Sequence, residues 1–200
     1  FFIDEFTESS FVAQRQQYPF LVGHLATHAN FRDGGVENSY IQFWNEQLSV
    51  SDLGRLSLGS PTVDLLILSA CRTAVGSAEA ELGFAGLTVK AGARTAIASQ
   101  WEVNDRATMI LMTYFYHFFN DPNVTTKAEA LQRAQLFLLE NPVEISSDRE
   151  LMLPDGQTIA LPDTDASYAS ADAKLSDSGD RYDLAHPFYW AAFTAIGSPW

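Results

Sequence analysis

The chain has 200 residues, of which 46% are hydrophobic, and it carries a formal net charge of −13. This length suits one α/β domain with a substantial core and is too short for two domains of ordinary size. We therefore expect a single domain over residues 1–200. A nucleic-acid partner is not expected, because the 12 Lys and Arg residues are outnumbered by 25 Asp and Glu and offer no clustered positive surface for phosphates.

No apolar run approaches the ~20 residues that a membrane-spanning helix needs, so no membrane partner is expected either. The single cysteine cannot form an internal disulfide, which fits a reducing compartment, and we expect a cytoplasmic protein. The chain begins with FFIDEF, without an initiator Met or a signal-peptide pattern. We expect it to be the C-terminal fragment of a longer protein.

Short apolar segments bounded by helix-breaking residues predict four core strands, and amphipathic segments between them predict three helices. The predicted strands span residues 20–26, 63–70, 94–99 and 188–196. The first predicted helix spans about residues 82–91, with Gly92 placed to stop it. The second begins after Asn104 as its cap, and the third begins at Thr126, where Thr126 and Glu129 form a capping-box pattern.

Strands that are apolar throughout and alternate with amphipathic helices are typical of a largely parallel sheet covered on both faces. We therefore predict an α/β fold, a three-layer αβα sandwich. Residues 146–183 are rich in Ser, Asp, Ala, Pro and Gly, and predict an acidic surface insertion. A short hairpin turning at Asp155-Gly156 is possible within this insertion.

The chemistry of the chain is expected where two predicted strands end. Cys71 directly follows the strand 63–70, and His28 lies two residues after the strand 20–26. Open α/β sheets place their sites at the carboxyl ends of strands, so neighbouring strands would bring both residues to one rim. An imidazole can take the proton of a thiol whose free pKa is ~8.5, which makes the pair a minimal set for peptide cleavage. The alternative is a packed Cys and a solvated loop His.

At these residues the sequence resembles the CHAT domains, relatives of caspases and separases in the caspase-like peptidase clan. The resemblance implies a caspase-like fold, with His28 as the catalytic imidazole and Cys71 as the nucleophile. His28 precedes Cys71 by 43 residues, near the ~50 typical of caspases. Five blocks carry the resemblance in order: HLATHANF, LLILSACRT, GLTVKAGARTAIASQWEVND, KAEALQRAQ and HPFYWAAFTAIGSP.

The resemblance also implies an oxyanion site made of two backbone N–H groups, that of the residue after the His and that of the Cys. Here these are Ala29 and Cys71, whereas members of the family usually have a Gly after the His. Because the donor is a backbone group, Ala29 can supply it, provided that the local conformation does not require a positive φ.

Two further residues resemble a separase segment that recognises a basic P1 side chain. Trp101 and Asp105 fall on these positions, which implies that Asp105 pairs with Arg or Lys of a substrate. The alternative is structural, because an Asp at a helix start is commonly a cap or a partner of the helix dipole.

The expected function is therefore that of a cysteine endopeptidase of the CHAT type with a preference for basic P1 residues. This chemistry requires no metal or organic cofactor. His24 lies four residues before His28 on one strand face, but without a carboxylate or Cys at ligand spacing we predict a structural role for it. The expected partners are a protein or peptide substrate and a regulatory helical-repeat region or partner protein. The alternative is a catalytically silent CHAT scaffold that binds a protein partner in signalling.

Overall fold

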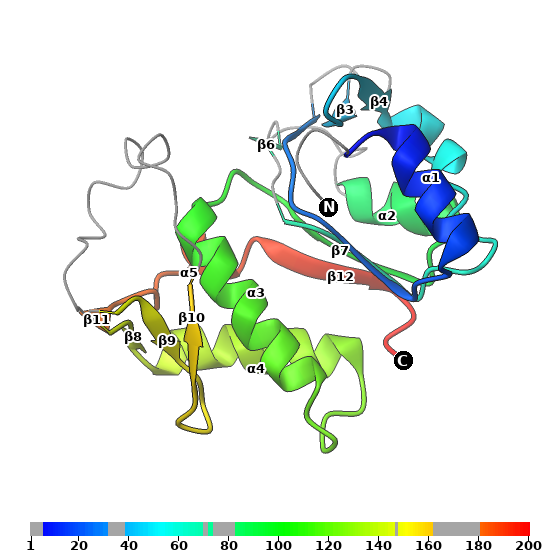
Figure 1. Cartoon of the computed structure of the whole chain (residues 1–200). Helices are drawn as coiled ribbons and strands as arrows, with labels where there is room; N and C mark the ends of the chain where they lie inside the picture. The colour runs from blue at the N-terminus through cyan, green and yellow to red at the C-terminus, as the bar shows by residue number, and fades with distance from the viewer. Residues whose placement is uncertain (1–5, 32–38, 70–71, 74–82, 147, 162–180) are drawn as a thin grey trace. The chain divides into compact units, whose positions relative to one another are not determined.

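A computed structural model describes most of the chain (Figure 1). Among the described residues, no helix is long and apolar enough to cross a membrane. The chain divides into two compact units, one made of residues 1–103 and 192–200 and the other of residues 104–191. The structure describes residues 6–31, 39–69, 72–73, 83–146, 148–161 and 181–200.

The first unit is built on a four-stranded sheet whose first three strands are parallel. Its order is β1 (Val22–Leu25), β5 (Leu65–Leu68), β7 (Thr95–Ser99) and β12 (Phe193–Gly197). β12 runs antiparallel to β7. Every residue of β5 and β7 is buried, as expected of strands without a solvated face.

Helices of the same unit cover this sheet. Helix α2 (Gly83–Lys90) packs on β7 and β12, and Phe11 of α1 (Glu8–Gln17) joins the same hydrophobic core. Both helices lie on one side of the sheet in Figure 1. The predicted α/β fold with a largely parallel sheet is thus confirmed. The first predicted helix, which Gly92 was expected to stop, corresponds to α2, which ends at Lys90.

A second small sheet of the first unit was not predicted. Its order is β4 (Gln47–Ser49), β3 (Tyr40–Gln42), β2 (Ala29–Phe31) and β6 (Arg72–Thr73). β2 runs antiparallel to β3 and parallel to β6. A 3₁₀ helix, η3 (Val50–Leu56), follows β4. These strands have two or three residues each, which is too short for a hydrophobic period to show.

The second unit consists mainly of a helix pair with two small strand pairs. Helices α3 (Asp105–Phe119) and α4 (Lys127–Glu140) pack together. The ring centroids of Tyr114 and Phe137 lie 4.7 Å apart. Strands β8 (Val143–Glu144) and β11 (Arg181–Tyr182) pair antiparallel.

The structure contains the hairpin that the sequence suggested inside the insertion. Strands β9 (Glu150–Met152) and β10 (Thr158–Ala160) pair antiparallel, and Gly156 at the turn has a φ of 82°. The Tyr114 hydroxyl of α3 donates to the Met152 carbonyl at 3.0 Å, which fixes the hairpin to the helix pair. Residues 162–180 of the predicted insertion lie outside the described residues.

The predicted strand 188–196 is wrong in its first half. Residues Pro187–Trp190 form the short helix α5, and the strand β12 begins only at Phe193. His186 caps this helix, since its Nδ1 accepts from the Phe188 N–H at 3.2 Å. Proline at the first helical position has a φ already set for a helix, which outweighs the β propensity of the aromatic residues that follow.

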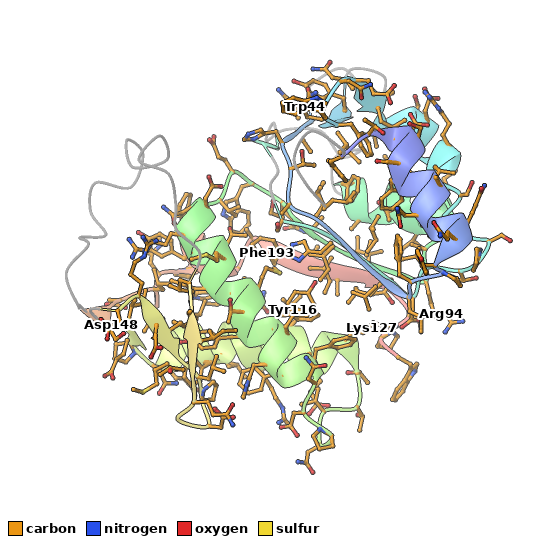
Figure 2. The ribbon with its side chains drawn as sticks, viewed as in Figure 1. Trp44, Arg94, Tyr116, Lys127, Asp148 and Phe193 are labelled. Atoms are coloured by element: carbon orange, nitrogen blue, oxygen red, sulfur yellow. The ribbon has the colours of Figure 1, made fainter. Side chains whose placement is uncertain are left out.

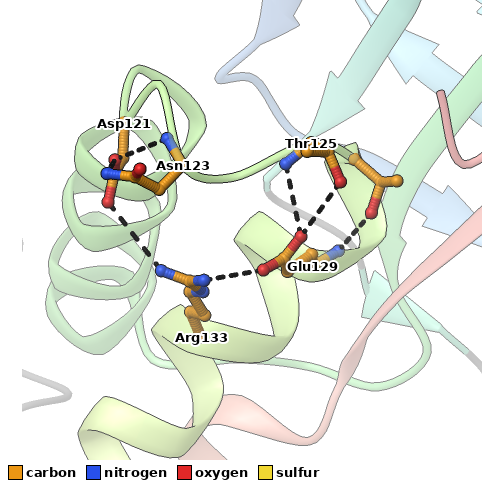
Figure 3. Close-up of polar contacts among 6 residues, drawn as sticks. Asp121, Asn123, Thr125, Glu129 and Arg133 are labelled. Carbon is orange, nitrogen blue, oxygen red and sulfur yellow. Dashed lines mark hydrogen bonds and ion pairs between the residues drawn. The ribbon is translucent and has the colours of Figure 1, made fainter.

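The start of α4 differs in detail from the predicted capping box (Figure 3). The Thr126 hydroxyl accepts from the Glu129 N–H at 3.0 Å, as predicted. The Glu129 carboxylate, however, accepts from the N–H of Thr125 at 3.2 Å, one residue before the cap. It also accepts from Arg133 at 2.7 Å, and Arg133 lies 3.8 Å from the Asp121 carboxylate. One arginine thus links the α3–α4 connection to the first turns of α4.

This cluster predicts a stability that falls in acid. The backbone N–H of Thr125 and the Arg133 guanidinium hold the pKa of Glu129 below its ordinary 4.5. A lowered folded-state pKa contributes stability above the unfolded pKa, and this contribution is lost as the pH falls through the folded value. We expect the melting temperature of Glu129→Gln to fall less on acidification than that of the wild type. The melting temperature of the control Glu140→Gln should fall as much as that of the wild type. Equal losses in the wild type and Glu129→Gln would contradict this.

Candidate functional site

The two strands predicted to carry the site are neighbours. β1 pairs with β5 in parallel, with Leu25 opposite Leu68, and the Ser69 N–H extends the pairing by donating to the Leu25 carbonyl at 3.3 Å. His28 follows β1 and directly precedes β2, with an exposed side chain. The expectation that the two strand ends share one rim of the sheet is therefore confirmed.

A second pairing joins the same two stretches of chain beyond the predicted catalytic positions. β2 pairs with β6 in parallel, with Asn30 opposite Arg72. Cys71 itself, with Ala70, lies outside the described residues. It is the residue that precedes Arg72 and follows Ser69 by two positions. The His28 stretch and the Cys71 stretch are thus joined by hydrogen-bonded pairings on both sides.

The backbone at Ala29 suits the predicted role of an oxyanion donor. The Gln42 N–H donates to the His28 carbonyl at 2.8 Å, and Ala29 is opposite Ile41 in the next pair of the β2–β3 ladder. Alternate residues of an antiparallel ladder direct their N–H groups to opposite sides. The Ala29 N–H therefore points away from β3, to the side on which β6 pairs.

Ala29 also does not adopt a positive φ, which was the condition for an alanine to serve at this position. Among the described non-glycine residues, Ser57 and Arg149 have positive φ and Ala29 does not. Ala29 is 4% exposed, so a donor at this position works in a setting that largely excludes water, where a hydrogen bond to a developing charge is strongest.

The two residues predicted for the P1 pocket belong to different units. Trp101 is half-buried in the first unit, and Asp105 is an exposed residue in the first turn of α3 in the second. Capping, one of the two structural roles foreseen for Asp105, is performed by Asn104, whose side-chain oxygen accepts from the Ala107 N–H at 2.8 Å. The helix-dipole role and the P1 role both stay predictions.

No metal site accompanies these residues in the part of the chain that the structure describes, because no group of three or more His, Cys, Asp or Glu is placed to hold an ion. His24 lies in β1 opposite Ile67. Its side chain is exposed, and desolvation of the part of the imidazole that the protein covers lowers its pKa below the ordinary 6.5.

Sequence reasoning missed two residues that hold the His28 stretch, Thr27 and Gln42. The Thr27 hydroxyl donates to the Gln42 carbonyl at 2.6 Å. The Gln42 side chain in turn donates to the Glu46 carbonyl at 3.1 Å, across the turn that carries Trp44, which is 57% exposed (Figure 2). No sequence signal marks the Thr27–Gln42 contact, since it joins isolated polar residues 15 positions apart.

These features define an α/β protein whose candidate site follows the carboxyl ends of two adjacent parallel strands. The family model described as CHAT domain matches residues 1–198, and so spans both units. The chain belongs to the CHAT domain family, which is related to the caspase-like cysteine peptidases. No curated protein matches the chain.

Proposed function

We propose that the chain is a cysteine endopeptidase of the CHAT type, with Cys71 as nucleophile and His28 as acid and base. The observation that carries this proposal is the double pairing around the two residues. β1 and β5 are paired before them, and β2 and β6 are paired after them. A Cys and His held in adjacent stretches at the carboxyl edge of a sheet suit nucleophilic attack on a carbonyl.

The proposed reaction has two steps. The Cys71 thiolate forms a bond to the carbonyl carbon of the scissile peptide, and the carbonyl electron pair moves to the oxygen. When the oxyanion collapses, the peptide C–N bond breaks and the leaving amine takes a proton from His28. A water molecule then attacks the thioester carbonyl while His28 accepts its proton. Collapse of this second oxyanion breaks the C–S bond, which releases the acid product and the Cys71 thiolate, and His28 can return the proton to the thiolate.

The N–H groups of Ala29 and Cys71 are the proposed oxyanion donors. The direction of the Ala29 N–H, away from β3, supports this role. Removal of one such donor typically costs 10²–10³-fold in kcat, so this part of the proposal concerns a large share of the rate. The proposed reaction uses no metal or organic cofactor.

The proposed substrate is a protein or peptide with Arg or Lys at P1, selected by Asp105 together with Trp101. The exposure of Asp105 leaves its carboxylate available to a substrate side chain, and the net charge of −13 favours approach of a basic peptide. We place the protein in the cytoplasm, where its thiol stays reduced. We further propose that a helical-repeat region or partner protein regulates it.

A peptide library with Arg, Lys, Asp or Asn at P1 tests the proposed specificity. We expect cleavage after Arg and Lys, and a fall of at least about tenfold in kcat/KM for Arg substrates in Asp105→Asn, because the bidentate ion pair with the guanidinium is lost. Asp155→Asn, at another exposed Asp of the second unit, is the control.

The outcomes separate the parts of the proposal. Cleavage after another residue, or full activity of Asp105→Asn on Arg substrates, would reject the P1 assignment and keep the peptidase. Absence of cleavage of every peptide, together with an unreactive thiol, would favour the silent scaffold.

A further inference from the structure

We propose that Thr27 is a positioning residue for the His28–Cys71 pair, a role that rests on the proposed function. Its hydroxyl donates to the Gln42 carbonyl at 2.6 Å, on the strand that faces the His28 stretch. Among the described residues, the partner of the Thr27 hydroxyl is a backbone carbonyl of β3. Thr27 acts through the backbone of its neighbour His28.

The contact stands at the point where the β2–β3 ladder departs from a regular pattern. His28 and Gln42 are opposite one another, and the Gln42 N–H donates to the His28 carbonyl at 2.8 Å. In a regular hydrogen-bonded pair the two residues exchange both N–H···O bonds. Here the register of the ladder begins one pair further on, at Ala29 and Ile41, and the Gln42 carbonyl accepts from the hydroxyl of Thr27.

The acceptor of this bond is itself held in place. The Gln42 side chain donates to the carbonyl of Glu46 at 3.1 Å and also to that of Phe43, and it accepts from the Gln47 side chain at 3.1 Å. Both ends of the β3–β4 turn are thereby tied to Gln42. A hydroxyl that bonds to a fixed carbonyl fixes its own residue in turn.

This arrangement fixes the backbone that carries two proposed groups of the site, the imidazole of His28 and the N–H of Ala29. Thr27 is bonded to β3 by its side chain and His28 by its carbonyl, so the peptide between them has two anchors. The same two anchors orient the imidazole of His28 and the N–H of Ala29. Since a displacement of about 1 Å can cost 10²-fold in rate, loss of one anchor is expected to lower catalysis more than stability.

The test compares Thr27→Val, which removes the hydroxyl at nearly constant volume, with Thr27→Ser, which keeps it. Thr62→Val is the matched control, because the Thr62 hydroxyl also donates to a backbone carbonyl, that of Gly59 at 3.1 Å. Thr27→Ala is a second variant without the hydroxyl, and thermal denaturation confirms that each variant is folded. The readouts are kcat and KM on an Arg peptide, and the pH dependence of iodoacetamide alkylation at the single cysteine.

We expect kcat of Thr27→Val to fall at least about tenfold with KM within about twofold, and Thr27→Ser and Thr62→Val to resemble the wild type. The pH midpoint of alkylation in Thr27→Val should rise toward the pKa of ~8.5 of a free thiol, because the imidazolium no longer pairs well with the thiolate. If His28→Ala inactivates the enzyme but Thr27→Val keeps the wild-type kcat and alkylation profile, the inference about Thr27 is overturned and the proposed function is not. If the wild type cleaves no peptide and His28→Ala leaves the pH dependence of alkylation unchanged, the proposed function is overturned, and this inference with it.

Discussion

Replacement of His28 by alanine is expected to lower kcat for peptide cleavage at least about 10³-fold, because removal of one member of a nucleophile–base unit costs nearly as much as removal of the whole unit. Two effects combine. Cys71 loses the base that takes its proton, and the leaving amine loses the acid that protonates it. The measurement is hydrolysis of a fluorogenic peptide with Arg at P1, together with the rate of Cys71 alkylation.

The control for this experiment is His117→Ala. His117 lies near the end of α3 in the second unit, where its ring contacts Phe118 edge-on, and its loss should leave kcat within about twofold of the wild type. If His28→Ala kept more than a tenth of the wild-type kcat, the imidazole would not be the acid and base of the reaction.

Gly92→Ala is expected to destabilise the protein by about 3 kcal/mol, because it combines backbone strain with overpacking. Gly92 ends helix α2 with a φ of 112°, a conformation that residues with a Cβ rarely adopt. A Cβ at this position would also lie 2.7 Å from both the Cα and the N of Gly59. These are backbone atoms, so no side-chain rotation relieves the contact.

Gly54→Ala is the matched control in the same unit. A Cβ at Gly54 meets no atom within 4 Å, and the substitution should change stability by less than about 0.5 kcal/mol. Chemical denaturation of both variants measures the difference. An equal effect of the two substitutions would mean that the close approach of Gly92 and Gly59 does not carry the destabilisation.

The core of the fold was predictable because single segments carried their own signals. β5 and β7 are apolar along their whole length, and the structure buries all of their residues. Asn104 and Thr126 cap α3 and α4 as their side chains predict. Each of these signals is local, so no knowledge of the partners was required.

The second sheet could not be predicted for the opposite reason. β6 has two residues and β2 has three, and their pairing depends on which strands lie beside them rather than on propensity. The same holds for the Thr27–Gln42 hydrogen bond. Sequence reasoning named His28 and Cys71 from the ends of two strands, but the pairing beyond them and the support of the His28 backbone are products of tertiary structure.

The short helix α5 shows how a local signal can be read wrongly. The aromatic run after His186 has high β propensity, yet the cap at His186 and the proline that follows it begin a helical turn. The strand starts only after that turn, at Phe193. Capping residues therefore outweighed propensity over a segment of four residues.

The central claim, that Cys71 is an activated nucleophile, is tested most directly by labelling with a peptide that ends in an Arg-linked electrophile. Mass spectrometry of the intact chain then counts the adducts, and the single cysteine makes a thiol adduct assignable without mapping. The account predicts one adduct per chain, which is absent in Cys71→Ala and forms at least about tenfold more slowly in His28→Ala. An unlabelled wild type, or equal labelling of the wild type and His28→Ala, would contradict it.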